Sequence, residues 1–115
     1  MRYDTKSKDK TMNVLLRIQR AVKAGRCRFS GKALIEMAAD GLRRRDAMEA
    51  IINARAIYKT LRSTSEFRDH ARERLYVIVG ESFSGVPIYT KGKLVVEAGA
   101  ETFYFLVSSK RAYWS

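Results

Sequence analysis

Residues 75–108 read LYVIVGESFSGVPIYTKGKLVVEAGAETFYFLVS, and the fold class follows from this stretch. β-Branched and aromatic residues dominate it, and glycines interrupt the runs at positions 80, 85, 92 and 99. Short runs of this composition between glycines are typical of β-strands joined by turns. They predict four strands within this stretch, over residues 75–79, 86–91, 94–97 and 102–108. A similar run predicts one more strand upstream, over residues 57–61.

The chain before residue 56 follows a helical period instead. Apolar residues recur at three- and four-residue spacing from Val14 to Val22, with Thr11 as a cap and Gly25 as an end. A second helix is expected between Ser30 and Gly41, and a third over 45–54. Helices followed by strands indicate an α+β fold, with N-terminal helices packed on a C-terminal antiparallel β-sheet. The 115 residues form one domain, in which residues 1–10 are expected to be a disordered or loosely held basic N-terminus.

Cysteine and histidine usage narrows the chemistry. Cys27 is the only cysteine and His70 the only histidine, so neither an internal disulfide nor a zinc site is expected. No metal and no other cofactor is predicted. The N-terminus lacks the apolar segment of a signal peptide, and no run has the ~18 apolar residues of a membrane span. We therefore expect a cytoplasmic protein without membrane contact.

The net charge is the strongest functional indication. The chain has 23 Lys and Arg against 12 Asp and Glu, a formal charge of +11. Such an excess favours polyanions, above all nucleic acid. Residues 1–28 hold nine basic and two acidic side chains, or +7 of this total. The alternative interpretation is a solvated basic surface, or one that binds an acidic protein. We expect RNA to be bound by Arg17, Arg20, Lys23, Arg43, Arg44, Arg45 and Lys91.

Hydrolytic motifs are absent, but metal-free RNA cleavage remains possible. With one histidine there is no Ser-His-Asp arrangement, and no phosphate-binding glycine motif occurs. The ribose 2′-OH is an internal nucleophile, so the protein needs only to position it, stabilise charge on the phosphate and move two protons. Lys, Arg and Tyr side chains can do this, and the strand half is rich in them.

Alternation along the predicted strands selects individual residues. In the strand over 57–61, Lys59 falls on the same side as Ile57 and Leu61, where desolvation would favour its neutral form and a role as a base. The alternative is that the stem lies on apolar neighbours while the ammonium reaches water. On later strands Tyr89 shares a side with Lys91, and Lys110 shares one with residues 104 and 108.

Several short segments, in this order, look like the MqsR family of toxins over residues 13–111: Ala24-Gly25-x-x-Arg28-Phe29-Ser30-x-x-Ala33-Leu34, Asp40-Gly41-Leu42, Ile51-Ile52, Tyr58-Lys59-Thr60, Gly85-x-x-Ile88-Tyr89-x-Lys91 and Leu106-Val107-Ser108-Ser109-Lys110. The resemblance implies a RelE-like arrangement, cleavage of mRNA without metal, and a cognate antitoxin protein as partner. It also implies that Lys59, Tyr89 and Lys110 occupy the catalytic positions, with Lys59 and Lys110 stabilising the scissile phosphate and Tyr89 acting at the leaving oxygen.

One departure from that family concerns its catalytic Gln, which precedes the later Tyr. This chain has no Gln after Gln19, and its corresponding strand begins Arg74-Leu75-Tyr76. Arg74 is therefore the fourth candidate, with Tyr76 as its alternative.

A non-catalytic nucleic-acid-binding or protein-interaction module is the competing hypothesis. The second and third predicted helices, joined near Gly41, have the layout of a helix-turn-helix motif, and Arg43–Arg45 would lie at the start of its recognition helix. Against it, Glu36 stands where that motif requires an apolar residue.

Overall fold

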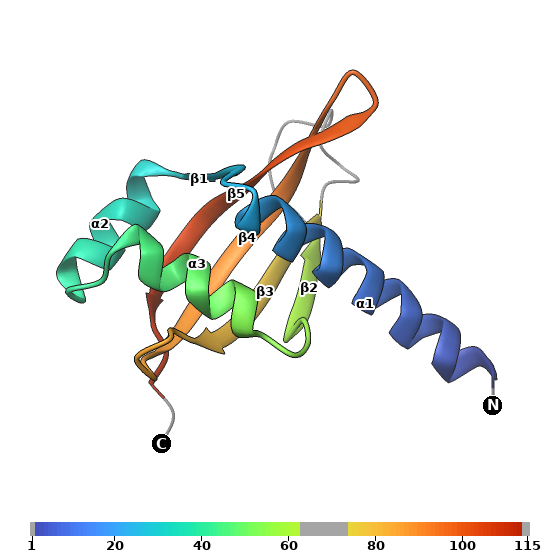
Figure 1. Ribbon diagram of the computed structural model, residues 1–115, viewed down its shortest axis with the longest axis horizontal. Coiled ribbons are helices and arrows are strands. Elements are labelled where there is room, and N and C mark those ends of the chain that lie inside the picture. The colour runs from blue at the N-terminus through green and yellow to red at the C-terminus, as the bar shows by residue number, and fades with distance from the viewer. Residues whose placement is uncertain (1, 63–73, 114–115) are drawn as a thin grey trace.

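The fold is α+β, as predicted, and the described part of the chain forms three helices and a five-stranded sheet (Figure 1). The computed structural model describes the backbone of residues 2–62 and 74–113, and side chains from residue 13 onward within those ranges, apart from residue 102. His70 lies outside the described residues. The elements in chain order are α1 (Arg2–Lys23), β1 (Cys27–Phe29), α2 (Gly31–Ala39), α3 (Arg44–Asn53), β2 (Lys59–Arg62), β3 (Arg74–Glu81), β4 (Pro87–Glu97) and β5 (Ala100–Arg111).

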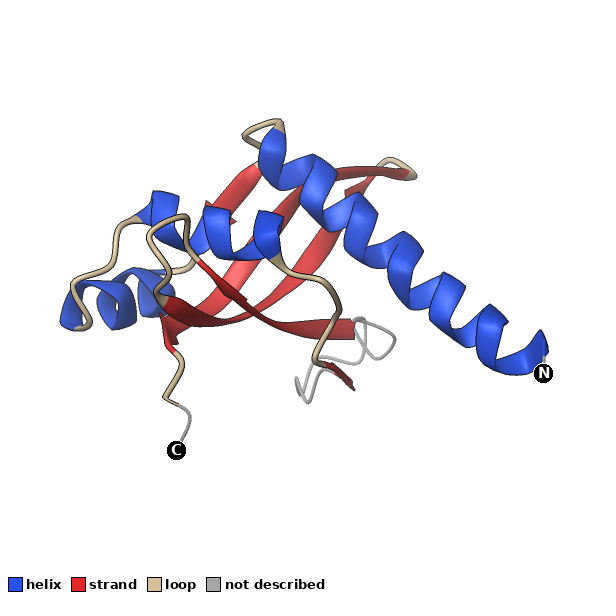
Figure 2. Cartoon of the chain, turned by 60° about the horizontal axis from the view of Figure 1, so that its bottom comes forward, coloured by secondary structure: helices blue, strands red, loops and turns tan. Residues whose placement is uncertain are grey.

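The strands lie in the order β1-β5-β4-β3-β2. All neighbours are antiparallel except β1, which runs parallel to β5. The three helices cover one face of this sheet (Figures 1 and 2), with α2 packed against β5, α3 against β3, and α1 against α3 and β5. The N-terminal half of α1 extends beyond the sheet.

The hydrophobic core lies between the helices and the sheet. Its central side chains are 0–2 % exposed, and each stabilises the fold by roughly 1.5–3 kcal/mol through its burial. They are Leu15, Ile18 and Val22 of α1, Met37 of α2, Ile51 of α3, Ile78 of β3, and Tyr104 and Leu106 of β5.

Local signals account for the second helix. The Ser30 hydroxyl accepts a hydrogen bond from the Ala33 amide at 3.0 Å, which is the predicted N-cap. The same hydroxyl donates to the Val107 carbonyl at 2.9 Å, so the cap also fastens α2 to β5. Gly41 follows the helix with a φ of +69°, the left-handed conformation that ends many helices.

Three features differ from the predicted elements. Helix α1 begins at Arg2, well before Thr11, and so includes residues 2–10. The short strand β1 was not predicted. Strand β4 is continuous where two strands were expected, because Gly92 is part of the strand and not of a turn. A Cβ at residue 92 would lie 2.7 Å from the Tyr104 ring, so glycine is needed there for close packing.

Among the described residues, we find no helix with the length and apolar character needed to cross a membrane.

Candidate functional site

The face of the sheet turned away from the helices carries three of the four predicted catalytic residues. Register and alternation define this face. Ile78 belongs to the core under the helices, so its strand neighbours Val77 and Val79 point to the other side. Val77 is paired with Lys59 on β2 and Lys91 on β4.

Val79 continues the same side of the sheet. It is paired with Tyr89, which is paired in turn with Lys110. We call this side the open face. Its described cationic and aromatic residues are Arg28, Lys59, Tyr89, Lys91, Lys93, Phe103, Phe105 and Lys110. The expected position of Lys110 on the same side as Tyr104 is wrong, because an irregularity in the pairing at Lys91 and Gly92 shifts the register and Tyr104 lies under the helices.

Tyr89, Lys91 and Lys110 form a compact cluster on the open face. The Lys110 Nζ lies 5.6 Å from the centre of the Tyr89 ring, within the range of a cation–π contact. Lys91 follows Tyr89 by two residues on the same strand, a backbone separation of about 7 Å. Within the described part of the chain, neither lysine is ion-paired. The cluster therefore combines two cations and a phenol within the reach of one phosphodiester and its neighbours.

Lys59 lies at the edge of this cluster. Lys59 lies three strand spacings across the sheet and two residues along it from Lys110. Their backbones are therefore about 16 Å apart. Its expected burial beside Ile57 is wrong, because the Lys59 side chain is exposed while Ile57 packs against the core under the helices. The reason is that β2 begins only at Lys59, so alternation does not extend back to Ile57.

Arg74 is not part of the cluster. It pairs with Arg62 and lies, by alternation, on the same side of β3 as Tyr76 and Ile78, which is the helix side. The open side of β3 carries only apolar residues in this region, Leu75, Val77 and Val79. Neither of the two proposed substitutes for the missing Gln therefore joins Tyr89. Lys91, which we had assigned to RNA binding, occupies the central position instead.

The cations of α1 belong to the other layer of the molecule. Arg17 is ion-paired with Glu101, with 2.8 Å between Nε and Oε2, and this hydrogen bond raises the pKa of the guanidinium. Arg20 and Lys23 are exposed on the same helix. The structure thus separates these three residues from the open face.

The arginines at the start of α3 take an intermediate position. Arg43, Arg44 and Arg45 are all exposed, and Arg44 lines a surface hollow of about 440 Å³ together with Arg28. Arg44 therefore connects the helix layer with the β1 edge of the open face.

Carboxylates in the described residues mostly serve the fold. The Asp46 carboxylate accepts a hydrogen bond from the Arg43 amide at 2.8 Å, and that of Glu49 accepts one from the Phe83 amide at 2.8 Å. The carboxylates of Glu36 and Asp40 likewise accept hydrogen bonds from backbone amides of β5. On the open side of the strands, acidic side chains occur only at the ends of β3 and β4, at Glu81 and Glu97. The described part of this face is therefore positively charged along its middle.

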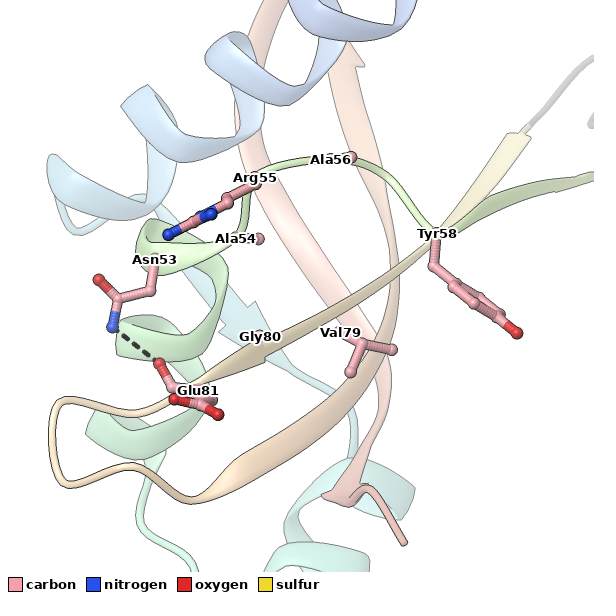
Figure 3. Close-up of a pocket in the computed structure, with 8 residues that line it drawn as sticks. All are labelled: Asn53, Ala54, Arg55, Ala56, Tyr58, Val79, Gly80 and Glu81. Atoms are coloured by element: carbon pink, nitrogen blue, oxygen red, sulfur yellow. Dashed lines mark hydrogen bonds between the residues drawn. The ribbon is translucent and has the colours of Figure 1, made fainter. Parts of the chain in front are cut away.

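A cleft of about 650 Å³ borders the open face at the end of β3 (Figure 3). It lies between the connection from α3 to β2 and the strand, and Tyr58 and Val79 line it. The Asn53 side chain closes one end by donating a hydrogen bond to the Glu81 carbonyl at 2.8 Å. The cleft thus adjoins the row of Val79, Tyr89 and Lys110.

Two groups in the structure have strongly shifted acidity, and both belong to the packing under the helices. Burial raises the pKa of the Cys27 thiol to about 12, and burial also raises the pKa of the Tyr104 phenol. In the described residues, no three His, Cys, Asp or Glu side chains lie together as potential metal ligands.

Comparisons with protein-family models, with curated proteins and with solved structures each returned no significant match.

Proposed function

We propose that this chain is a metal-independent endoribonuclease that cleaves RNA on the open face, as the toxin component of a cytoplasmic toxin–antitoxin pair. The observation that carries the proposal is the cluster of Tyr89, Lys91 and Lys110 on a cationic sheet face. The resemblance of residues 13–111 to the MqsR toxins supports the assignment to mRNA and to an antitoxin partner. The charge of +11 suits both an RNA substrate and an acidic protein partner.

The chemistry follows from the three side chains. The 2′-OH attacks the adjacent phosphorus and gives up its proton to solvent water, while negative charge grows on the non-bridging oxygens. Lys91 and Lys110 stabilise that charge in the transition state. This stabilisation raises the cleavage rate, whereas contacts that bind the ground state and the transition state equally do not. The bond from phosphorus to the 5′-oxygen breaks, and Tyr89 donates a proton to this leaving group. The products are a 2′,3′-cyclic phosphate and a 5′-hydroxyl.

Lys59 and the cleft beside Tyr58 complete the proposed site. Lys59 is too far from Lys110 to share one oxygen without extension of both side chains, so it serves a neighbouring phosphate or stabilises the scissile one from the edge of the sheet. The cleft offers space for a base next to the cut. Arg44 supplies further backbone affinity at the other edge of the sheet.

A cleavage assay with defined RNA tests this function. A mixed-sequence single-stranded RNA is incubated with purified protein in excess EDTA, and the product ends are analysed. We expect cleavage with 2′,3′-cyclic phosphate ends, no cleavage where the cut site carries a 2′-deoxyribose, and no cleavage of DNA. A Lys91→Ala/Lys110→Ala protein, purified in parallel, controls for contaminating nuclease. A requirement for metal, or equal cleavage of DNA, would place the protein in another class, and binding without cleavage would favour the non-catalytic module.

A further inference from the structure

A second group of side chains lies on the open face, at the end opposite to Tyr89 and Lys110. It consists of Arg28 from β1, Lys93 from β4, and Phe103 and Phe105 from β5. Arg28 and Lys93 are close to Phe105 through the strand register, since Phe105 is paired with both. Four side chains from three strands thus meet at one place on the sheet.

Their mutual geometry is that of stacked cations and rings. The Arg28 Cζ lies 4.2 Å from the centre of the Phe103 ring, and the Lys93 Nζ lies 5.9 Å from that of Phe105. The two rings meet edge to face, with centroids 6.5 Å apart and planes inclined by 79°. At 4.2 Å the guanidinium lies over the Phe103 ring, and Arg28 is exposed, so a ligand can approach this pair from solvent.

The core under the helices does not account for these two phenylalanines. Tyr104 and Leu106 alternate with them along β5 and are completely buried beneath the helices, whereas Phe103 and Phe105 are half-buried on the other side. An outer sheet face that needed only solubility would carry polar residues there. Aromatic rings combined with cations are instead the residue types that bind unpaired nucleotides, because rings and guanidinium planes stack on bases while positive charge attracts phosphates.

We infer that Arg28, Lys93, Phe103 and Phe105 form a base-stacking subsite for single-stranded RNA. The inference rests on the proposed function and deepens that function. It names unpaired RNA as the form of substrate, and it gives the RNA a direction across the sheet. Bases in a duplex hide their faces, so a stacking subsite selects single strands. One base would stack on the outer side of the Arg28 guanidinium, and a second would lie against the exposed part of Phe105.

The subsite and the cluster are too far apart for one nucleotide to contact both. Five residues separate Phe105 from Lys110 along β5, or about 17 Å. An RNA that occupies both must therefore extend over several nucleotides of the open face. Contacts at the subsite strengthen binding of a longer RNA but are out of reach of a dinucleotide held at Lys110.

Binding of RNA that cannot be cleaved tests the subsite separately from catalysis. We would use a fluorescein-labelled ten-nucleotide RNA with 2′-O-methyl groups throughout, and measure dissociation constants by anisotropy. Phe103→Leu/Phe105→Leu keeps apolar volume but removes both rings. Phe83→Leu is the matched control, because Phe83 is 68 % exposed in the turn between β3 and β4, away from this group. Arg28→Gln is a second variant that leaves the rings in place, and thermal melting establishes that each variant is folded.

We expect the double phenylalanine variant to bind the ten-nucleotide RNA about 10- to 100-fold more weakly, and Arg28→Gln about 5-fold more weakly. Phe83→Leu should bind like the wild type, and a duplex of the same length should show no dependence on the rings. Weaker binding of the ten-nucleotide RNA by the folded double phenylalanine variant, with normal binding by Phe83→Leu, would support the subsite. If the folded variants bind like the wild type, or if the wild type binds no RNA, the inference is wrong.

The two proposals fail in different ways. A protein that binds the methylated RNA through Phe103 and Phe105 but never cleaves unmodified RNA contradicts the proposed nuclease function and leaves the stacking subsite standing. A protein that cleaves with no contribution from these rings contradicts the subsite alone.

Discussion

Glu36 of α2 accepts a hydrogen bond from the Ser109 amide at 3.1 Å, directly before Lys110. The same Glu36 oxygen, Oε1, accepts a second bond from the Ser108 hydroxyl at 2.7 Å. One helical turn later, Asp40 accepts from the Arg111 amide at 2.8 Å. Strand β1 ends earlier along β5, at the level of Leu106. Carboxylates of α2 therefore continue the edge bonding of β5 where β1 stops, and they hold both neighbours of Lys110.

Replacing Glu36 tests this attachment. Glu36→Ala leaves the Ser109 amide without its partner and should lower the free energy of unfolding by about 1–3 kcal/mol. Glu36→Gln retains a carbonyl oxygen at Oε1 that can accept both bonds, so its loss should be less than half as large. Urea denaturation of the two variants measures the difference. Equal losses would show that charge, and not hydrogen bonding to β5, is what matters at this position.

Gly80 predicts a second effect on stability. A Cβ at residue 80 would lie 2.0 Å from the Ala50 carbonyl oxygen, so Gly80→Ala must push α3 away from β3. We expect a loss of about 1–3 kcal/mol or more from this overpacking. Gly31→Ala is the matched control, because nothing lies within 4 Å of a Cβ there. Thermal melting compares the two, and the packing of α3 on β3 would be contradicted if Gly80→Ala melted like the control.

Cys27 predicts a dependence of stability on alkaline pH. Burial raises the pKa of its thiol from the ordinary 9.0 to about 12, so between these values the thiol ionises in the unfolded chain but not in the folded one. The unfolded state then binds fewer protons, and the free energy of unfolding falls as pH rises through this window. The loss from this group should reach roughly 2 kcal/mol near pH 10.5. The effect becomes negligible about one pH unit below the ordinary thiol pKa of 9.0.

The measurement is the slope of the melting temperature between pH 8.5 and 10.5, for the wild type and for Cys27→Ala. Removing the thiol should make the slope shallower, both directly and because the neighbouring Cys27 contributes to the raised pKa of the Tyr104 phenol. Superimposable slopes would mean that Cys27 is not protected from ionisation in the fold.

Salt dependence distinguishes the two faces of the molecule. If RNA lies on the open face, Lys91→Gln and Lys110→Gln should each reduce the slope of log Kd against log salt by about 0.7, the value for one phosphate contact on a single strand. Arg20→Gln/Lys23→Gln removes two charges from the helix layer and should leave the slope unchanged. If Arg20→Gln/Lys23→Gln instead reduces the slope more than the substitutions on the open face, then the first helix binds the RNA backbone, as the distribution of charge along the sequence predicts.

The helix layer was largely predictable because its signals are local. Ser30 and Gly41 bound α2 as expected, and the apolar period from Val14 to Val22 identifies the buried side of α1. β1 had no such signal. Three residues between two helices become a strand only because the edge of β5 needs a partner, and that edge is remote in the sequence.

The sequence named some residues of the candidate site, but it did not predict how they are arranged. Alternation placed Tyr89 and Lys91 together, and the register then added Lys110. The same rule misled at Lys59, where the strand had only begun, and nothing local showed that Arg74 would fall on the helix side. Arg28 was missed as a site residue because its significance comes from Phe103, on a distant strand.

The single-turnover cleavage rate at saturating single-stranded RNA tests the central claim most directly. It should be measured in EDTA for Lys110→Ala, for Tyr89→Phe, and for Lys32→Ala, which removes an exposed lysine of α2 away from the open face. We expect the first two substitutions to lower the rate by about 100-fold or more, because they remove charge stabilisation and proton donation in the transition state, and Lys32→Ala to leave it unchanged. If Lys110→Ala and Tyr89→Phe cleave at the rate of Lys32→Ala, the open face is not the catalytic site.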